Sequence, residues 1–355
     1  MGSDRSEWGS SGEFDLGSDL LCVAGADGRF VSMSAAWERL LGWSREELQA
    51  RPFIEFVHPD DVQHTIAARA RVAGPDAEIP DLVNRYRTRD GGYRWLRWST
   101  RSDGESWFGV ARDVTERQER EERLRQILRE ENLLAYSQPI LDQRRMRISH
   151  EELLVRLRPP GGEVMQPAEF LPDAERLGLI SIVDCWMLRQ GLRMAGLGRA
   201  TTVNVSSRSI DEPEVLRELC ETVEAAPHAA RNLVFEITET AALDHIDAAL
   251  DLIERVEPLG CRFALDDFGT GYGSLTHLRR LPVHYLKIDR SFVRGVTRNP
   301  ADQALVRSVV AIASELGLRT VAEGVEDGAT LELLREYAVD HVQGFLIGVP
   351  EPLLH

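Results

Sequence analysis

Residues 261–275 read CRFALDDFGTGYGSL, an apolar run that ends in two adjacent carboxylates, Asp266 and Asp267, before three closely spaced glycines. A short apolar run bounded by turn signals predicts a buried strand. Four more runs share this character: TTVNV (201–205), NLVFEIT (232–238), HYLKID (284–289) and RTVAEGV (319–325). Segments with helical periodicity, such as 181–197 and 301–318, lie between them. This alternation indicates a parallel sheet covered by helices, and a length of about 220 residues favours a closed (β/α) barrel.

Polar side chains end each of these runs. They are Asn204, Glu236, Asp266 with Asp267, Lys287 and Glu323. A single carboxylate at a strand end is usually a helix cap or an ion-pair partner, but the strand ends of a barrel share one rim, where barrel enzymes place their chemistry. Oxygen ligands without a Cys or His cluster favour Mg²⁺ or Mn²⁺ over zinc. Because one of two adjacent aspartates can bridge two ions, we expect a pair of cations, an arrangement that promotes phosphoryl displacement.

The composition narrows the class of protein. The chain has 355 residues, with 42 Lys and Arg against 58 Asp and Glu, and a formal net charge of −16. Sequence-independent DNA binding requires a basic surface, so DNA is not an expected partner. The four cysteines form no CxxC pair, which argues against a zinc site or a disulfide framework and fits a reducing cytoplasm. No apolar run approaches the roughly 18 to 20 residues of a membrane span, so the expected location is cytoplasmic.

The chain is expected to contain two domains after a leader. Residues 1–17 are rich in Ser and Gly and predict a flexible leader. Short strands and helices, with turn signals at ADGRF (26–30) and DGG (90–92), predict a small α+β domain over residues 18–114. The barrel is expected over residues 135–355.

Residues 115–134 contain no Gly or Pro and begin with a helix-capping Thr115, so they predict a helix that connects the two domains. The apolar positions in and beside this helix form a narrow stripe: Val114, Leu124, Ile127, Leu128 and Leu134. Two interpretations stay open. The stripe suits a seam between two chains, which predicts a homodimer, and a solvated linker helix is the alternative.

Several motifs of the C-terminal part occur in a fixed order. They are ELLVR (152–156), PAEFLPDAERLGLI (167–180), VNVS (203–206), FEITE (235–239), DDFGTGYGSL (266–275), LKIDRSFV (286–293), AEGVE (322–326) and QGFLIGVPEP (343–352). Together they resemble the EAL domain of cyclic di-GMP phosphodiesterases over about residues 122–355. The resemblance implies a (β/α)8 TIM-like barrel that hydrolyses cyclic di-GMP to linear 5′-phosphoguanylyl-guanosine with two Mg²⁺ or Mn²⁺ ions, and so lowers the level of a bacterial second messenger.

The same resemblance implies a role for each matching residue. One metal is held by Glu152, Asn204, Glu236 and Asp266, and the second by Asp266, Asp267 and Glu323. The catalytic group comprises Lys287 at the nucleophilic water or reacting phosphate, Glu323 as a candidate base, and Asp267. The residues that face the substrate or support the site are Arg156, Gln343, Glu239 as the anchor of the DDFGTGYGSL loop, and Glu326.

Two positions depart from that family's usual motifs. The Glu-Ala-Leu signature is Glu152-Leu153-Leu154 in this chain, which keeps the metal-binding glutamate, so activity is expected to survive. The commoner GYSSL ending is GYGSL, in which Gly273 replaces a serine and is expected to loosen the packing of the loop.

The N-terminal motifs are LCVAGADGRFVSMSAAWERLLGWSREEL (21–48), FVHPDD (56–61), RYRTRDGGYRWLRWSTR (85–101) and FGVARDVTERQ (108–118). They resemble a PAS sensor domain over residues 18–117, which implies a regulatory input passed along the connecting helix. The resemblance does not identify its ligand. Cys22 is not in a flavin-adduct motif, so light sensing by that route is not expected. Neither histidine is expected to bind haem: His58 lies in an HPDD turn and is expected to be a helix cap, and His64 is alone on a helix. Five tryptophans are expected in a core or dimer face: Trp37, Trp43, Trp95, Trp98 and Trp107.

Other interpretations of the glycine-rich loop lack their context. A dinucleotide fingerprint needs glycine where Ser274 stands, and a kinase DFG motif needs an HRD loop that the chain lacks.

Three function classes stay open: an active phosphodiesterase, a module that binds cyclic di-GMP without cleaving it, and a sensor for which the barrel is an oligomerisation platform. We expect the enzyme, because no metal ligand of the family is replaced. The chain contains no GGDEF-like run, so synthase activity is not expected.

Overall fold

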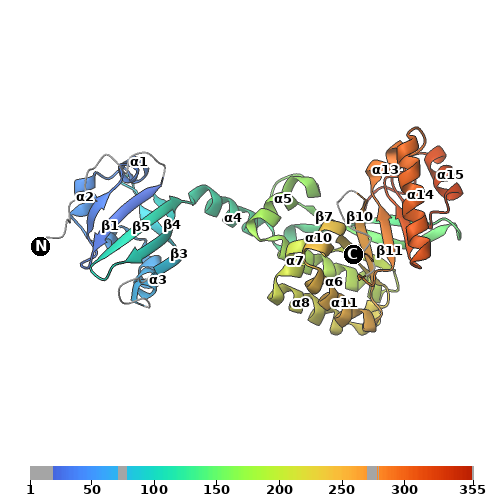
Figure 1. Cartoon of the computed structure of the whole chain (residues 1–355), viewed down its shortest axis with the longest axis horizontal. Helices are drawn as coiled ribbons and strands as arrows, with labels where there is room; N and C mark the ends of the chain where they lie inside the picture. The colour runs from blue at the N-terminus through green and yellow to red at the C-terminus, as the bar shows by residue number, and fades with distance from the viewer. Residues whose placement is uncertain (1–18, 71–77, 270–277, 279, 354–355) are drawn as a thin grey trace, which may run out of the picture. The chain divides into compact units, whose positions relative to one another are not determined.

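The computed structural model describes residues 19–70, 78–269, 278 and 280–353 (Figure 1). The predicted leader and most of the glycine-rich loop, including Gly273 and Ser274, lie outside these residues. The chain divides into two compact units, Met1–Arg123 and Leu124–His355.

The N-terminal unit is built on an antiparallel sheet in the order β2-β1-β5-β4-β3 (Figure 1). Its strands are β1 (Leu20–Gly25), β2 (Phe30–Met33), β3 (Glu78–Arg87), β4 (Tyr93–Ser102) and β5 (Ser106–Asp113). Its helical segments are α1 (Ala36–Leu41), α2 (Arg45–Gln49), η2 (Phe53–Phe56) and α3 (Pro59–Ala70). The two predicted turns join β1 to β2 and β3 to β4, so the α+β class is confirmed.

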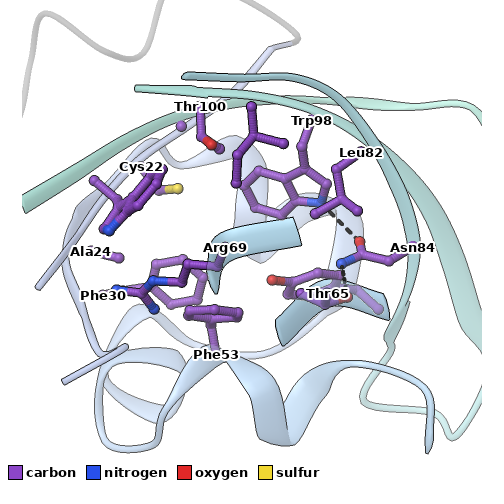
Figure 2. A pocket seen from close by; sticks show the side chains of 14 residues that line it. Cys22, Ala24, Phe30, Phe53, Thr65, Arg69, Leu82, Asn84, Trp98 and Thr100 are labelled. Atoms are coloured by element: carbon purple, nitrogen blue, oxygen red, sulfur yellow. Dashed lines mark hydrogen bonds between the residues drawn. The ribbon is translucent and has the colours of Figure 1, made fainter. Parts of the chain in front are cut away.

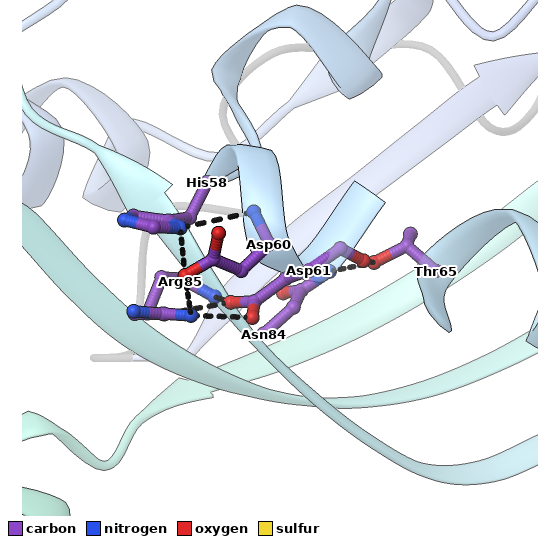
Figure 3. Close-up of polar contacts among 6 residues, drawn as sticks. All are labelled: His58, Asp60, Asp61, Thr65, Asn84 and Arg85. Carbon is purple, nitrogen blue, oxygen red and sulfur yellow. Dashed lines mark hydrogen bonds and ion pairs between the residues drawn. The ribbon is translucent and has the colours of Figure 1, made fainter. Parts of the chain in front are cut away.

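Aromatic packing and one ion pair hold this unit together. Trp37 and Trp98 are 0% and 5% exposed, with ring centroids 5.5 Å apart, as expected for core residues. Asp61 in α3 accepts hydrogen bonds from Arg85 Nε and Nη2 of β3 at 2.9 and 2.7 Å (Figure 3). His58 Nδ1 accepts the backbone N–H of Asp60 at 3.2 Å, so it caps α3 as expected, whereas His64 is exposed on the same helix.

The C-terminal unit is a closed barrel. Strands β6 to β13 follow one another in chain order around it, and β13 pairs back with β6. They are β6 (Leu133–Asp142), β7 (Arg147–Leu157), β8 (Thr201–Asn204), β9 (Leu233–Thr238), β10 (Arg262–Phe268), β11 (Tyr285–Ile288), β12 (Arg319–Ala322) and β13 (His341–Gln343), with a short β14 (Glu351–Pro352) added on β6. This topology confirms the predicted barrel.

Helices connect the strands and cover the barrel (Figure 1). Between β7 and β9 they are α5 (Pro167–Leu177), α6 (Ile180–Gly196), α7 (Ser207–Asp211), α8 (Pro213–Glu224) and α9 (Pro227–Ala230). Between β9 and β13 they are α10 (Glu239–Asp244), α11 (Ile246–Val256), η4 (Glu257–Leu259), α13 (Arg290–Gly295), α14 (Pro300–Glu315) and α15 (Gly328–Glu336). Among the described residues no helix is long and apolar enough to cross a bilayer.

The first barrel strand differs from the predicted all-parallel arrangement. β6 runs antiparallel to both β7 and β13, whereas the neighbouring pairs from β7 to β13 are parallel. Only residues 143–146 separate β6 from β7. A connection this short can join only antiparallel strands, because a parallel crossover needs about a dozen residues or more.

The connecting helix is shorter than predicted. Helix α4 spans Thr115–Ile127, and a short helical turn, η3 (Glu130–Asn132), leads into β6. Leu128 is only 2% exposed and belongs to the barrel core, against which Leu124 and Ile127 also pack. Burial of apolar surface therefore draws these three residues of the predicted two-chain stripe into their own barrel.

Candidate active site

Strand alternation directs the predicted polar residues into the barrel. Ile140, Val234, Ala264, Tyr285 and Val321 form a separate apolar cluster, one residue from each of five strands, apart from the core beneath the helices. Successive strand residues face opposite sides, so the position two residues farther along each parallel strand faces the same interior. Those positions are Glu236, Asp266, Lys287 and Glu323. The acidic and basic groups therefore form a layer on the carboxyl side of the apolar cluster.

Lys287 lies at the centre of this layer. Its side chain is 1% exposed, and Nζ lies 2.5 Å from a Glu323 oxygen and 2.8 Å from a Glu236 oxygen. Asp266 and Glu152 follow at 3.3 and 3.5 Å. Lys287 is also the single lysine of the chain, in which every other cationic side chain apart from histidine is arginine. A compact ammonium group suits a position surrounded by four carboxylates, where a planar guanidinium would need more room.

Amide side chains orient Glu152 from two sides. Asn204 Nδ2 donates to one carboxylate oxygen at 2.9 Å, and Gln343 Nε2 donates to the other at 2.8 Å. Gln343 Nε2 also donates to Oε1 of Gln138 at 3.2 Å. The oxygen of Gln343 is buried and has no hydrogen-bond partner among the described residues. An unpaired buried acceptor of this kind needs a donor or a cation.

Asp267 joins the layer through an irregularity in β10. Strict alternation would turn its side chain away from that of Asp266. Asp267 instead has a φ of 55°, and the pairing of β10 with β11 shifts register between Leu265 and Phe268. Its carboxylate thereby comes within 4.8 Å of the carboxylate oxygens of Asp266 and Glu323. A register shift that re-aims a side chain is common beside active sites.

Burial and crowding shift the pKa values of this layer in different directions. Burial opposes the charge on Lys287, but the attraction of Asp266 and the three nearby glutamates outweighs burial and raises its pKa well above the usual range. Burial and the neighbouring Glu152 raise the pKa of Glu236. Burial also raises the pKa of Glu323 to about 7, although Lys287 opposes the shift. One ammonium group does not fully compensate these carboxylates in the absence of other cations.

The donor set fits divalent metal ions. Asp266, Asp267 and Glu323 each offer one oxygen within a shared distance of 4.8 Å, and Lys287 already occupies a cation position beside them. Carboxylate and amide oxygens without thiol ligands are the preferred donors of Mg²⁺ and Mn²⁺. The unpaired oxygen of Gln343 is a further neutral donor in the same layer.

A cavity of ≈290 Å³ opens over the layer. Predicted residues that line it are Glu152, Asp266, Lys287, Glu323, Glu326 and Gln343. Gln138, Arg290, Arg294 and Phe345 also line it and were not identified from the sequence. Gln138 belongs to β6, which was not predicted as a strand, while Arg290 and Arg294 lie on α13 directly after the LKID motif. Arg290 and Arg294 could have been identified from the sequence, because they lie one helical turn apart directly after a strand that ends in a lysine motif.

Three of the predicted residues make their contacts around this centre. Glu239 accepts the backbone N–H of Gly269 at 3.0 Å, so it holds the start of the glycine-rich loop. Glu326 pairs with Arg294 at 2.9 Å. Arg156 is buried and lies 5.1 Å above the Tyr136 ring, where its Nη1 donates to the carbonyl of Val155 at 2.8 Å. It is not among the residues that line the cavity.

The fold and the site define a (β/α)8 barrel protein with a carboxylate cluster at the strand ends that could hold metal ions. A family model described as the EAL domain matches residues 121–350, and one described as the PAS fold matches residues 30–108. The chain belongs to the EAL domain family and carries an N-terminal PAS domain.

Named relatives agree with this assignment. The chain is 38% identical over 247 residues to the cyclic di-GMP phosphodiesterase NbdA of Pseudomonas aeruginosa, a match that covers 68% of this chain and 32% of NbdA. It is 32% identical over 241 residues to the cyclic di-GMP phosphodiesterase PdeB of Shewanella oneidensis, covering 65% of this chain and 28% of PdeB. The chain thus spans about a third or less of the length of these relatives.

Solved structures match the barrel over nearly their whole length. PaMucR phosphodiesterase in its c-di-GMP complex is 33% identical with a TM-score of 0.62, and the match covers 66% of this chain and 98% of that one. The FimX EAL domain from Pseudomonas aeruginosa bound to c-di-GMP is 28% identical with a TM-score of 0.59, covering 64% and 94% of the two chains.

Proposed function

We propose that the barrel hydrolyses cyclic di-GMP to linear 5′-phosphoguanylyl-guanosine. The observation that carries the proposal is the convergence of Glu152, Glu236, Asp266 and Glu323 on Lys287 Nζ at the strand ends. Glu152, Asn204, Glu236 and Asp266 would hold one divalent ion, and Asp266, Asp267 and Glu323 a second. Such ions, when bound, neutralise phosphodiester charge and make water a stronger nucleophile near neutral pH. The names of NbdA, PdeB and PaMucR support this substrate.

The side chains of the layer would position the reactants and move the proton. Burial raises the pKa of Glu323 to about 7, so this carboxylate can take up a proton near neutral pH and is our candidate base. Lys287 keeps its charge, so its ammonium group can donate to a phosphate oxygen or to the attacking water. Gln343 holds Glu152 from one side, and Arg290 and Arg294 add positive charge to the cavity wall. Arg156 would reach a substrate phosphate only after leaving its contact with Val155.

Turnover in the presence and absence of metal tests this proposal. The full chain is incubated with cyclic di-GMP and Mg²⁺ or Mn²⁺, with and without a chelator, and the linear product is measured by chromatography. We expect Asp267→Ala to abolish turnover and Glu323→Gln to lower it roughly 10²- to 10⁴-fold. Glu254→Gln removes an exposed carboxylate of α11 and is the matched control. Near-native turnover of Asp267→Ala, or metal-dependent binding without cleavage by the native chain, would contradict the proposal.

We further propose that the PAS domain regulates the barrel through α4 and that the chain forms a homodimer through the PAS domain, α4 and the barrel. The connection of the PAS domain to the barrel by α4 supports regulation. Because Leu124, Ile127 and Leu128 pack on the barrel core, the dimer would rest on other surfaces of these parts. Sedimentation of the full chain tests the dimer, and a monomer at micromolar concentration would contradict it.

A further inference from the structure

The PAS domain has a partly open cavity of ≈70 Å³ between its sheet and its helical segments (Figure 2). Phe30, Phe53, Leu82 and Trp107 are among the side chains that line it. Native interiors contain few voids larger than a water molecule. An apolar space of this size is therefore able to hold the hydrocarbon part of a small molecule.

Polar groups on one wall of this cavity are already paired. Trp98 Nε1 donates to Asn84 Oδ1 at 2.8 Å, and Asn84 Nδ2 donates to Thr65 Oγ1 at 3.0 Å (Figure 2). The Thr65 hydroxyl in turn donates to the carbonyl of Asp61 at 2.8 Å (Figure 3). These three side chains already hydrogen-bond one another and the backbone, so they are not the first groups of the lining that a ligand would pair with.

The lining also holds one buried hydroxyl group without such a partner. Thr100 Oγ1 is buried and makes no hydrogen bond with any described residue. Tyr86, which is 2% exposed, is a second hydroxyl-bearing residue of the lining. A buried polar group without a partner costs free energy, which a ligand that supplies an acceptor would recover.

Arg69 adds a positive charge to the same lining. Its guanidinium carbon lies 5.5 Å from the Phe53 ring centroid and 5.4 Å from that of Trp107, and Nη2 donates to the carbonyl of Gly25 at 3.3 Å. No described carboxylate lies within ion-pair distance of it. The nearby Asp27, whose charge also acts on Arg69, forms its ion pair with Arg29 at 3.7 Å. A half-buried guanidinium between two rings, with no described carboxylate in ion-pair contact, keeps N–H donors for an anion.

We propose that this cavity binds a short-chain aliphatic monocarboxylate. Its carboxylate would be held by Arg69, with Tyr86 and Thr100 as further donors, and its hydrocarbon chain would lie among the apolar side chains. The Arg69 guanidinium only donates hydrogen bonds, and the Thr100 and Tyr86 hydroxyls can donate them, so the complementary ligand supplies acceptors and negative charge. A cavity of about 150 Å³ accepts benzene, so the present volume fits a hydrocarbon chain of about three or four carbons.

Ligand discrimination by the native full chain is the main test. Propionate, butyrate, octanoate and the neutral isostere butyramide are titrated in the presence of a chelator, which keeps metal ions in the barrel from recruiting carboxylates. Tryptophan fluorescence is the readout, because Trp98 and Trp107 line the cavity, and the thermal midpoint is measured in parallel. We expect saturable binding of butyrate, at least roughly 10-fold weaker binding of butyramide, and no gain for octanoate, which exceeds the available space.

Three variants assign the binding to named groups. Arg69→Met is expected to weaken butyrate binding roughly 10- to 100-fold, because a hydrogen-bonded ion pair is lost. Ala24→Leu fills the lined space without removing a donor and is expected to abolish binding. Arg112→Met removes a guanidinium that is 73% exposed and does not line the cavity, so it controls for loss of charge and should bind as the native chain does.

Several results would overturn the proposal. They are equal affinity for butyrate and butyramide, unchanged butyrate affinity of Arg69→Met, or no saturable binding of any acid, as expected if water alone satisfies the Thr100 hydroxyl. The comparison of acid with amide uses only the native chain, so it decides the matter even if Arg69→Met folds poorly. None of these readouts depends on phosphodiester hydrolysis.

Discussion

Replacement of Lys287 by methionine removes the cation that compensates the acidic layer. In the native chain Nζ lies between 2.5 and 3.5 Å from carboxylate oxygens of Glu323, Glu236, Asp266 and Glu152. Methionine has similar length and no charge, so the packing of the interior changes little. We expect Lys287→Met to be much less stable than the native chain when metal ions are removed by a chelator.

The expected magnitude follows from these distances and from burial. One ion pair at 3 Å is worth roughly 5 to 6 kcal/mol at an effective dielectric constant of about 20. Desolvation of the buried partners, several kcal/mol for each ion, offsets most of this attraction. Removal of one partner of a buried pair therefore costs about 3 to 5 kcal/mol. A surface pair such as Arg255 with Glu224 at 2.9 Å contributes only about 0 to 1 kcal/mol, so Arg255→Met is the matched control.

The loss of stability is also expected to depend on pH. Without Lys287, the carboxylates of the folded barrel take up protons more readily than those of the unfolded chain, because Lys287 opposes the raised pKa of Glu323. A group whose pKa is raised by folding stabilises the folded state below its unfolded pKa and loses this effect as the pH rises. For Glu323 the stabilising effect is lost as the pH rises from 4.5, the ordinary pKa, through about 7, the pKa in the folded native chain. In the variant this loss extends to higher pH. The deficit of Lys287→Met should therefore shrink as the pH falls from about 8 to about 5.5.

Urea unfolding followed by hydrogen-exchange mass spectrometry measures this effect. Peptides from β9, β10 and β11 report on the barrel separately from the PAS domain, which matters because two units need not unfold together. Added Mg²⁺ should recover part of the loss, since a second source of positive charge then enters the layer. The reasoning is refuted if Lys287→Met in chelator is as stable as Arg255→Met.

Three further predictions concern metal binding, pH and packing. In the native chain Mg²⁺ should raise the thermal midpoint of the barrel. Asp267→Asn should remove this rise, and its metal-free barrel should be at least as stable as the metal-free native barrel. An unchanged Mg²⁺ response of the variant would exclude Asp267 as a ligand. Burial, then His341 and Lys287, lower the pKa of His150 to about 3, so its neutral form stabilises the barrel above about pH 6.5 and this effect is lost as the pH falls. His150→Gln should thus reduce the slope of unfolding free energy by up to about 1.4 kcal/mol per pH unit between pH 6.5 and 5, measured by urea unfolding, and an unchanged slope contradicts this. Gly191→Ala places a Cβ 2.5 Å from a Val203 methyl and should cost about 1 to 3 kcal/mol by the same assay, whereas Gly328→Ala, with no atom within 4 Å, should cost little.

Local sequence patterns determined much of the barrel and most of its site. Each predicted strand from β8 to β12 is an apolar run with a polar residue near its end, because a strand buried on both faces needs apolar side chains while the rim of the barrel meets water. Glu236, Asp266, Lys287 and Glu323 were identified from that pattern, and they meet in the structure. Strand alternation at a period of two is a local property, so it could be followed along the sequence.

Tertiary structure alone decided the features that depend on closure and register. Gln138 and Gln343 are 205 positions apart and meet only because β6 turns back along β7 and pairs with β13. Asp267 reaches the carboxylates of Asp266 and Glu323 only through the register shift in β10, which reverses the facing that alternation predicts. Leu128 packs on the barrel core instead of on a partner helix. The whole folded chain decides which surface buries an apolar side chain and where a strand pairing shifts by one residue. Neither feature produces a periodic pattern in the local sequence.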